Sequence, residues 1–138
     1  MWALIFIMAG VFFPIACSAL DAEKAKQAMA SELAQCAGYY MALSTLSLQP
    51  NNGDNTLPGS EKLQKSGERA MEIAGTYSAN ENQLGQIGGS AAELFIFSSN
   101  RPEWKKAKET YAKHCDSIIT DPEARYKYWL SSADGKTK

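Results

Sequence analysis

Three cysteines are the first residues that could do chemistry, and they lie at Cys17, Cys36 and Cys115. Cys17 falls in an N-terminal segment that we expect to be removed, which leaves two. Cys36 and Cys115 each fall in the middle of a helical stretch, on its apolar stripe. An even number of cysteines in an exported chain favours a disulfide, and only one pairing is then possible. The alternative is two buried free thiols in a cytosolic core.

A metal or redox role for these cysteines is less well supported by the sequence. There is no Cys-x-x-Cys motif, and a zinc ion needs about four protein ligands. Two cysteines and a single histidine fall short of that number unless carboxylates join them. We therefore expect no metal site.

His114 is the only histidine, so a histidine-based catalytic triad has one possible centre. It adjoins Cys115, but residues one apart on a helix point in different directions. A Cys-His nucleophile would also need a free thiol. We expect an exposed histidine beside the core stripe, and we find no catalytic signature elsewhere, so the sequence predicts no catalytic residue and no enzyme.

A haem bundle would use a methionine from the first helix and a histidine from the last, and Met29 and His114 match that pattern superficially. If Cys36 pairs with Cys115, these two cysteines lie at the same height along the bundle axis. Met29 then lies seven residues away, about 10 Å along the helix axis. The disulfide would also occupy the space that a porphyrin needs. We expect no cofactor, and a bundle that binds a small ligand or haem stays the alternative.

Aromatic residues are the remaining candidates for recognition. Tyr39 and Tyr40 are adjacent, so we expect only Tyr40 to face the core and Tyr39 to lie to its side. Near the C-terminus the run Arg125-Tyr126-Lys127-Tyr128-Trp129 mixes cations and aromatic rings. Tyrosine, tryptophan and arginine are favoured at interface centres. A possible partner surface thus comprises Tyr39, Arg125, Tyr128 and Trp129, unless Tyr126 and Trp129 simply pack the last helix onto the bundle.

The overall charge excludes some classes of partner. The chain has 138 residues, with 14 basic and 15 acidic side chains, and its hydrophobic fraction is 45%. A near-neutral chain of this length is one domain and is not a nucleic-acid binder by electrostatics. An unknown protein partner is possible, whereas a nucleic-acid partner is not expected.

The elements that would position these residues begin with an apolar N-terminal segment. Sixteen of the first 19 residues are apolar and none is charged. An apolar run, a break at Pro14 and the small residues Cys17 and Ala19 predict a signal peptide over 1–19, cleaved after Ala19. Two alternatives remain: an uncleaved membrane anchor, or a lipoprotein signal with lipid on Cys17. The protein would then be secreted or periplasmic, with membrane contact only through this segment.

Composition predicts an all-α fold for 20–138, a single helical domain. This part contains 16 alanines and no valine, which favours helices over strands. We expect helices over about 21–48, 61–78, 83–99, from Asn100-Arg101-Pro102 to about 120, and over about 122–130. The stretches 61–78 and 83–99 could also form one kinked helix. A flexible loop over 49–60 and a frayed tail over 131–138 complete the arrangement.

The helix ends and the core stripe follow from local patterns. Asp21, Ser60 and Asp121 are typical N-cap residues. The first helix places an apolar stripe on one face, at spacings of four and three: Met29, Leu33, Cys36, Tyr40, Leu43 and Ser47. The expected architecture is a compact bundle of about four helices plus a short C-terminal helix, held by one disulfide.

The stretch Glu32-Leu33-Ala34-Gln35-Cys36-Ala37-Gly38-Tyr39-Tyr40 resembles the first helix of uncharacterised small exported helical proteins of bacteria and their phages, with its Cys-Ala-x-Tyr-Tyr pattern. The segment Asp121-Pro122-Glu123-Ala124-Arg125 with Trp129 is similar to their closing helix. The resemblance implies export and the helical disulfide, and it implies no activity. We therefore expect an exported, non-enzymatic protein that binds another protein or acts as an envelope-associated accessory factor.

Overall fold

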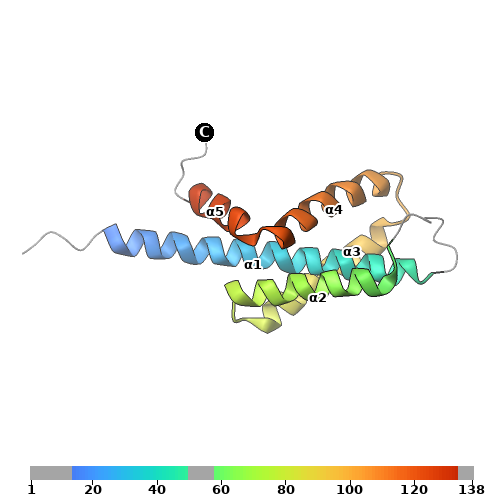
Figure 1. Cartoon of the computed structure of the whole chain (residues 1–138), viewed down its shortest axis with the longest axis horizontal. Helices are drawn as coiled ribbons and strands as arrows, with labels where there is room; N and C mark the ends of the chain where they lie inside the picture. Colours follow the sequence, from blue (N-terminus) through green and yellow to red (C-terminus); the bar gives the residue numbers. More distant parts are fainter. Residues whose placement is uncertain (1–13, 50–57, 134–138) are drawn as a thin grey trace, which may run out of the picture.

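The structure is a computed structural model that describes residues 14–49 and 58–133, with side chains described from Asp21 to Ser132. These residues form five helices and no strand: α1 (Pro14–Ser47), α2 (Ser60–Tyr77), α3 (Glu81–Ser98), α4 (Trp104–Thr120) and α5 (Pro122–Ala133). In Figure 1 the long helix α1 lies between α2 and α3 on one side and α4 and α5 on the other. Every other helix packs against α1. The expected all-α bundle with a short C-terminal helix is confirmed.

The disulfide joins α1 to α4. Cys36 and Cys115 are bonded, with their Cα atoms 5.5 Å apart and a separation of 79 positions in the sequence. Both side chains are buried. Cross-linking a loop of this length removes denatured-state entropy worth about 4.5 kcal/mol in the chain-entropy model. That is a large share of a typical folding free energy of about 5–15 kcal/mol.

Helix α1 is buried on more than one face, because four helices surround it. The stripe from Met29 to Leu43 lies in the core as expected, while Ser47 is only half-buried. Residues off that stripe are also buried: Ala30, Ala34, Ala37, Tyr39 and Ala42. Tyr39 is only 1% exposed. The expectation that only one of the two adjacent tyrosines faces the core is therefore wrong, since protein covers α1 on both sides.

Small residues let α1 approach its neighbours closely. A Cβ atom added at Gly38 would lie 2.8 Å from the Cβ of Ala91 and would collide with the backbone at Gly88. A Cβ atom at Gly67 on α2 would lie 3.3 Å from the carbonyl oxygen of Ala37. Glycine at position 38 is a packing requirement, because a side chain there would push α3 off α1. At Gly67 the contact is tight, and a side chain would need α1 or α2 to shift by a few tenths of an ångström.

The stretches 61–78 and 83–99 form two helices, α2 and α3. Ser78 leaves the helix with an extended backbone, and Asn80 caps α3 by accepting a hydrogen bond from the backbone N–H of Gln83 at 3.1 Å. An asparagine at this position stabilises a new helix start. The polar interruption at 78–82 therefore ends one helix and begins another.

Three helix starts differ from those expected. Helix α1 begins at Pro14, seven residues before Asp21, and proline is well suited to a first turn because it lacks the N–H. Gly59, not Ser60, is the N-cap of α2, while the Ser60 hydroxyl lies 2.8 Å from that of Ser44 on α1. Helix α4 begins at Trp104, because Pro102 lies inside a turn that the backbone N–H of Trp104 closes by donating to the carbonyl of Arg101 at 3.1 Å.

The last helix starts where expected and ends later. The Asp121 carboxylate accepts a hydrogen bond from the backbone N–H of Ala124 at 3.0 Å, which confirms the cap. Helix α5 continues to Ala133, beyond the expected end near Leu130. The hydroxyls of Ser131 and Ser132 donate to the carbonyl of Tyr128 at 2.8 and 2.9 Å, and these bonds satisfy a backbone acceptor near the helix end.

Parts of the expected domain layout lie outside the described residues. These are 1–13 of the expected signal peptide, 50–57 of the expected loop, and 134–138 of the expected tail. Residues 14–19 belong to α1. Within the described ranges, none of the helices has the length and apolar character needed to cross a bilayer.

Candidate functional site

Glu32 on α1 joins three helices through its carboxylate. One oxygen lies 2.7 Å from Nε2 of His114 on α4 and accepts a hydrogen bond from Nη2 of Arg125 on α5 at 2.5 Å. The other oxygen accepts from Nε of Arg125 and from the indole N–H of Trp129, both at 2.9 Å. We call Glu32, His114, Arg125 and Trp129 the Glu32 cluster. Its Arg–carboxylate pair is bidentate, and such charge-assisted pairs are among the strongest hydrogen-bonded contacts between side chains.

The electrostatics of the cluster favour an ionised Glu32. Burial raises the pKa of Glu32, but the hydrogen bonds from Arg125 and Trp129 and the charge of Arg125 outweigh it, so the pKa lies below its ordinary value. The hydrogen bond to Glu32 raises the pKa of Arg125, against the opposing effect of burial. Only 14% of the Glu32 side chain is exposed. The cluster is therefore a charged, largely desolvated set of hydrogen bonds and an ion pair that holds α5 against α1.

Arg125 also supports an aromatic surface on α5. Its guanidinium carbon lies 4.4 Å from the ring centre of Tyr128 and 5.4 Å from that of Trp129. The two rings lie edge to face, with centroids 5.5 Å apart. Tyr128 is 47% exposed, whereas Trp129 is half-buried. We call Arg125, Tyr128 and Trp129 the α5 surface.

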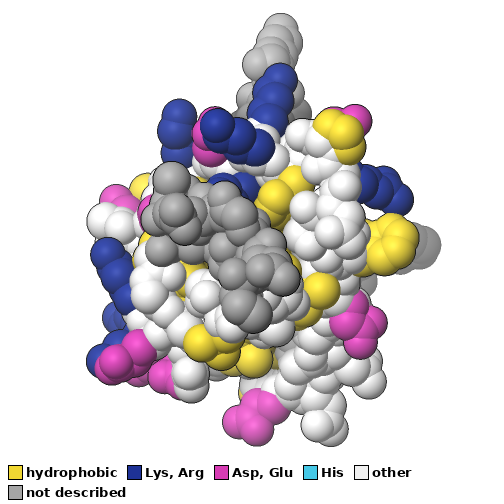
Figure 2. All heavy atoms as spheres, turned by 90° about the vertical axis from the view of Figure 1, so that its right-hand side faces the viewer, with side chains coloured by type: hydrophobic (Ala, Val, Ile, Leu, Met, Phe, Trp, Pro, Cys, Tyr) yellow, Lys and Arg dark blue, Asp and Glu magenta, His cyan; other side chains and the backbone are white. Residues whose placement is uncertain are grey.

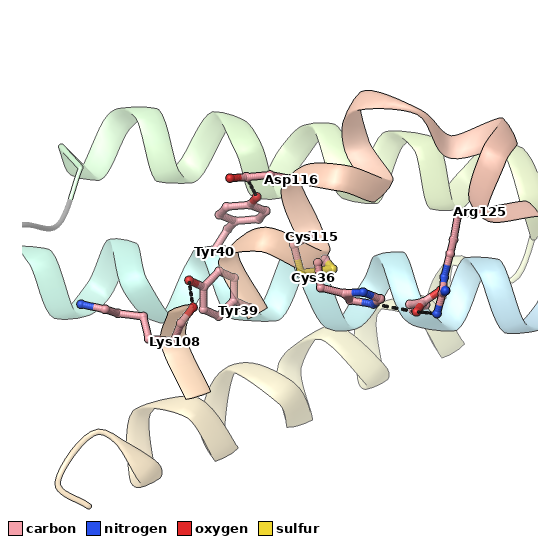
Figure 3. Close-up of a disulfide and its surroundings, with 9 residues drawn as sticks. Cys36, Tyr39, Tyr40, Lys108, Cys115, Asp116 and Arg125 are labelled. Atoms are coloured by element: carbon pink, nitrogen blue, oxygen red, sulfur yellow. Dashed lines mark hydrogen bonds and ion pairs between the residues drawn. A yellow bond between two sulfur atoms is a disulfide. The ribbon is translucent and has the colours of Figure 1, made fainter. Parts of the chain in front are cut away.

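The structure brings three of the four expected partner-surface residues together and separates the fourth. Arg125, Tyr128 and Trp129 form the α5 surface, but Tyr39 lies in the core. The Tyr39 hydroxyl donates to the carbonyl of Lys108 at 3.1 Å, as Figure 3 shows. Rings of α1, α3 and α4 surround Tyr39: Tyr40, Phe95 and Tyr111. The expectation that Tyr39 belongs to a partner surface is wrong, because its ring is inaccessible.

The tyrosine pair anchors α4 to α1. Burial, together with the Asp116 carboxylate nearby, raises the pKa of Tyr39 to about 12. The hydroxyl of Tyr40 donates to the carboxylate of Asp116, and burial and that bond raise the pKa of Tyr40 as well. Both hydroxyls therefore stay protonated at neutral pH and act as donors. Figure 3 shows these contacts on one side of the disulfide and Arg125 on the other.

The disulfide and the Glu32 cluster share one cavity. A solvent-open cavity of about 320 Å³ is lined by residues of α1 and α4: Glu32, Gln35, Cys36, Thr110, Tyr111 and His114. His114, expected to be an exposed residue, is half-buried, with 38% of its side chain accessible and its Nε2 atom 2.7 Å from the Glu32 carboxylate. Met29, the other candidate haem ligand, is completely buried in the apolar core. Within 14–49 and 58–133 no three histidine, cysteine or acidic side chains are grouped to hold a metal ion.

Sequence reasoning missed Glu32, the centre of the site. A signal was present, because Glu32 lies four residues before Cys36 and therefore on the same side of α1. The bond between Cys36 and Cys115 places His114 close to that side. Arg125 and Trp129 lie four apart on one face of α5, so a single carboxylate can meet both.

Comparisons with known proteins do not assign the chain to a family. No model of a protein family matches it, and no curated protein or solved structure matches it significantly. The site must therefore be interpreted from its own geometry.

Proposed function

We propose that this is an exported, non-enzymatic helical protein that binds another protein through the α5 surface. One observation carries the proposal: the exposed ring of Tyr128 rests on Arg125, and Arg125 is itself fixed by Glu32. An aromatic side chain that is held before binding loses little conformational freedom when a partner covers it. Tyrosine, tryptophan and arginine are also the residues that dominate binding energy at interfaces.

Export is supported by two features of the chain. The uncharged apolar segment over 1–19 has the composition of a signal peptide, and a disulfide is typical of oxidising compartments. Mass measurement of the protein recovered from its host's envelope or medium tests this. We expect a chain that begins at Leu20. A mass that includes the first 19 residues would contradict cleavage and indicate an anchor, and added lipid on Cys17 would indicate a lipoprotein.

The binding role is tested by photo-crosslinking in the host. A photoreactive phenylalanine analogue is placed at Tyr128, and as a control at Gln83, an exposed residue of α3. We expect one discrete crosslinked protein from position 128 and none from position 83. Glu32→Gln should weaken that crosslink without abolishing the fold, because it frees Arg125 from its anchor. Equal crosslinks at both positions, or none at 128, would refute the α5 surface.

A second candidate function is small-ligand binding, which one cleft favours. It has a volume of about 270 Å³, lies between α2 and α4, and its lining residues include Tyr40, Lys62 and Asp116. This is close to the lower end of typical ligand pockets. Native mass spectrometry separates the two functions, since a ligand adduct appears without any partner protein. A Soret band would identify that ligand as haem.

A further inference from the structure

Helix α4 is attached to the rest of the bundle at few points. Two of its 17 residues, Cys115 and Ile118, are fully buried, and both lie near its C-terminal end. Figure 1 shows α4 crossing toward α1 at an angle, whereas α2 lies along α1. The packing of α4 against each described helix is correspondingly less extensive than that of α2 or α3 against α1. Apolar burial therefore holds α4 less firmly than it holds α2 and α3.

Three solvent-open cavities border α4. A groove of about 470 Å³ between α3 and α4 is lined partly by Tyr111. The cleft of about 270 Å³ on the α2 side is lined partly by Ala112 and Asp116, and the cavity of about 320 Å³ beside the disulfide is lined partly by His114. Figure 2 views the end of the molecule where α3 meets α4 and shows hydrophobic side chains exposed there among charged ones. A helix bordered by open space can be displaced with little movement of its neighbours.

Hydrogen bonds are the other attachment of α4 to α1 besides the disulfide. They join three pairs of residues: Tyr39 with Lys108, Tyr40 with Asp116, and Glu32 with His114. Asp116 is exposed and His114 is half-buried, so water competes for two of these bonds. On the α3 side, the rings of Tyr111 and Phe95 pack edge to face. Without the covalent bond, a local opening of α4 needs to break only these contacts.

The two ends of α4 are fixed independently of the disulfide. Asp121 alone separates α4 from α5, and α5 is held on α1 by the bonds of Arg125 and Trp129 to Glu32. At the other end, residues 99–103 connect α4 to α3. Loss of the disulfide would therefore release α4 between two elements that stay in place.

The cavity beside the disulfide gives a small thiol a route to it. Cys36 lines this cavity and is 2% exposed, whereas Cys115 is completely buried. A thiolate therefore attacks Sγ of Cys36, forms a mixed disulfide there, and displaces Cys115 as a thiolate that takes a proton from water. A second thiolate then attacks the sulfur of the reagent in the mixed disulfide. The two reagent thiols end as a disulfide, and both cysteines end as thiols.

We propose that the disulfide is a redox-controlled attachment of α4: reduction by a small thiol releases α4 from α1 and exposes Tyr39, while α2, α3 and α5 keep their places. Helix α4 covers Tyr39, since the Tyr39 hydroxyl meets the carbonyl of Lys108 and its ring stacks on Tyr111, with centroids 5.8 Å apart. This inference does not depend on the α5 surface, and crosslinking at Tyr128 would still test the proposed function if α4 stayed attached.

Hydrogen–deuterium exchange of the full chain, before and after reduction with dithiothreitol, tests the release. In the oxidised protein we expect both 104–120 and 60–77 to be protected at least about a hundredfold. In the reduced protein, protection of 104–120 should fall below about tenfold while 60–77 stays protected, because the opening is local. The double variant Cys36→Ser/Cys115→Ser should behave as the reduced protein does. Protection of 104–120 that survives reduction, or its loss from both segments together, would overturn the proposal.

The rate of reduction by dithiothreitol tests the route. Thr110→Trp, in the lining of the cavity, should slow reduction at least about threefold, because it narrows the approach to Cys36. The matched control Lys113→Trp, at an exposed position of α4 outside that lining, should change the rate less than about twofold. The rate should also vary little with urea below the unfolding transition, since attack through an open cavity needs no unfolding. A steep rise with urea, or equal effects of the two substitutions, would refute this route.

Discussion

Replacing Glu32 with glutamine perturbs the site at its centre. The carboxylate accepts from four donors, two on each oxygen. A glutamine amide would present N–H donors to two of those four, and Arg125 would lose its counter-charge. Breaking a buried ion pair costs about 3–5 kcal/mol. Because Glu32 is 14% exposed and Arg125 27% exposed, solvent relieves part of that cost, and we expect about 2 kcal/mol.

Urea denaturation followed by circular dichroism and tryptophan fluorescence measures this change. The control is Glu23→Gln, an exposed glutamate on the same helix, for which we expect a change below about 0.5 kcal/mol. A double-mutant cycle with Arg125→Gln should show that the two losses are coupled, because they remove the same pair. A loss below about 0.5 kcal/mol for Glu32→Gln would refute the argument that this cluster holds α5 on α1.

Three other predictions concern the pH dependence of the Glu32 contribution, the disulfide and the close contact between α1 and α3. The pKa of Glu32 is lower in the folded state, so its contribution to stability is complete above the ordinary value of 4.5 and is lost as the pH falls below that value. The difference in unfolding free energy between wild type and Glu32→Gln should therefore shrink when urea titrations are repeated in acid. A difference that stays constant with pH would contradict this. The free energy of unfolding of the double variant Cys36→Ser/Cys115→Ser should be about 4 kcal/mol lower than that of the wild type, as should that of the chemically reduced wild type. Full stability after reduction would exclude a structural role for the disulfide. Gly38→Ala should lower the free energy of unfolding by about 2 kcal/mol. The control Gly89→Ala, with open space at its Cβ position, should raise it by about 0.5–1 kcal/mol. Equal shifts of the melting temperature in the two variants would refute the close α1–α3 contact.

Local patterns were sufficient for the helices and the disulfide. The alanine-rich composition gave the class, and the spacing of apolar residues placed Cys36 and Cys115 on stripes that could face each other. Asp121 showed its capping role directly in the sequence. These features depend on neighbours within a few residues, where helix geometry is fixed.

The site depended on contacts that local patterns do not contain. Glu32 meets partners 82 to 97 positions away in the sequence, and a glutamate beside an apolar stripe is usually solvated. Tyr39 was misplaced for a related reason. Periodicity identifies the main buried face of a helix, but α1 is covered from several sides, so residues beside the stripe are buried as well.

The central position of α1 has a consequence for the order of folding. It is the first described helix to be synthesised, yet its cover includes residues as late as Trp129. The faces of α1 that pack on α4 and α5 therefore stay uncovered until most of the chain has been made, and these contacts join residues far apart in the sequence. Such topologies fold more slowly than bundles of local contacts. During that interval α1 would be a natural target for chaperones, and oxidation of Cys36 must wait until Cys115 arrives.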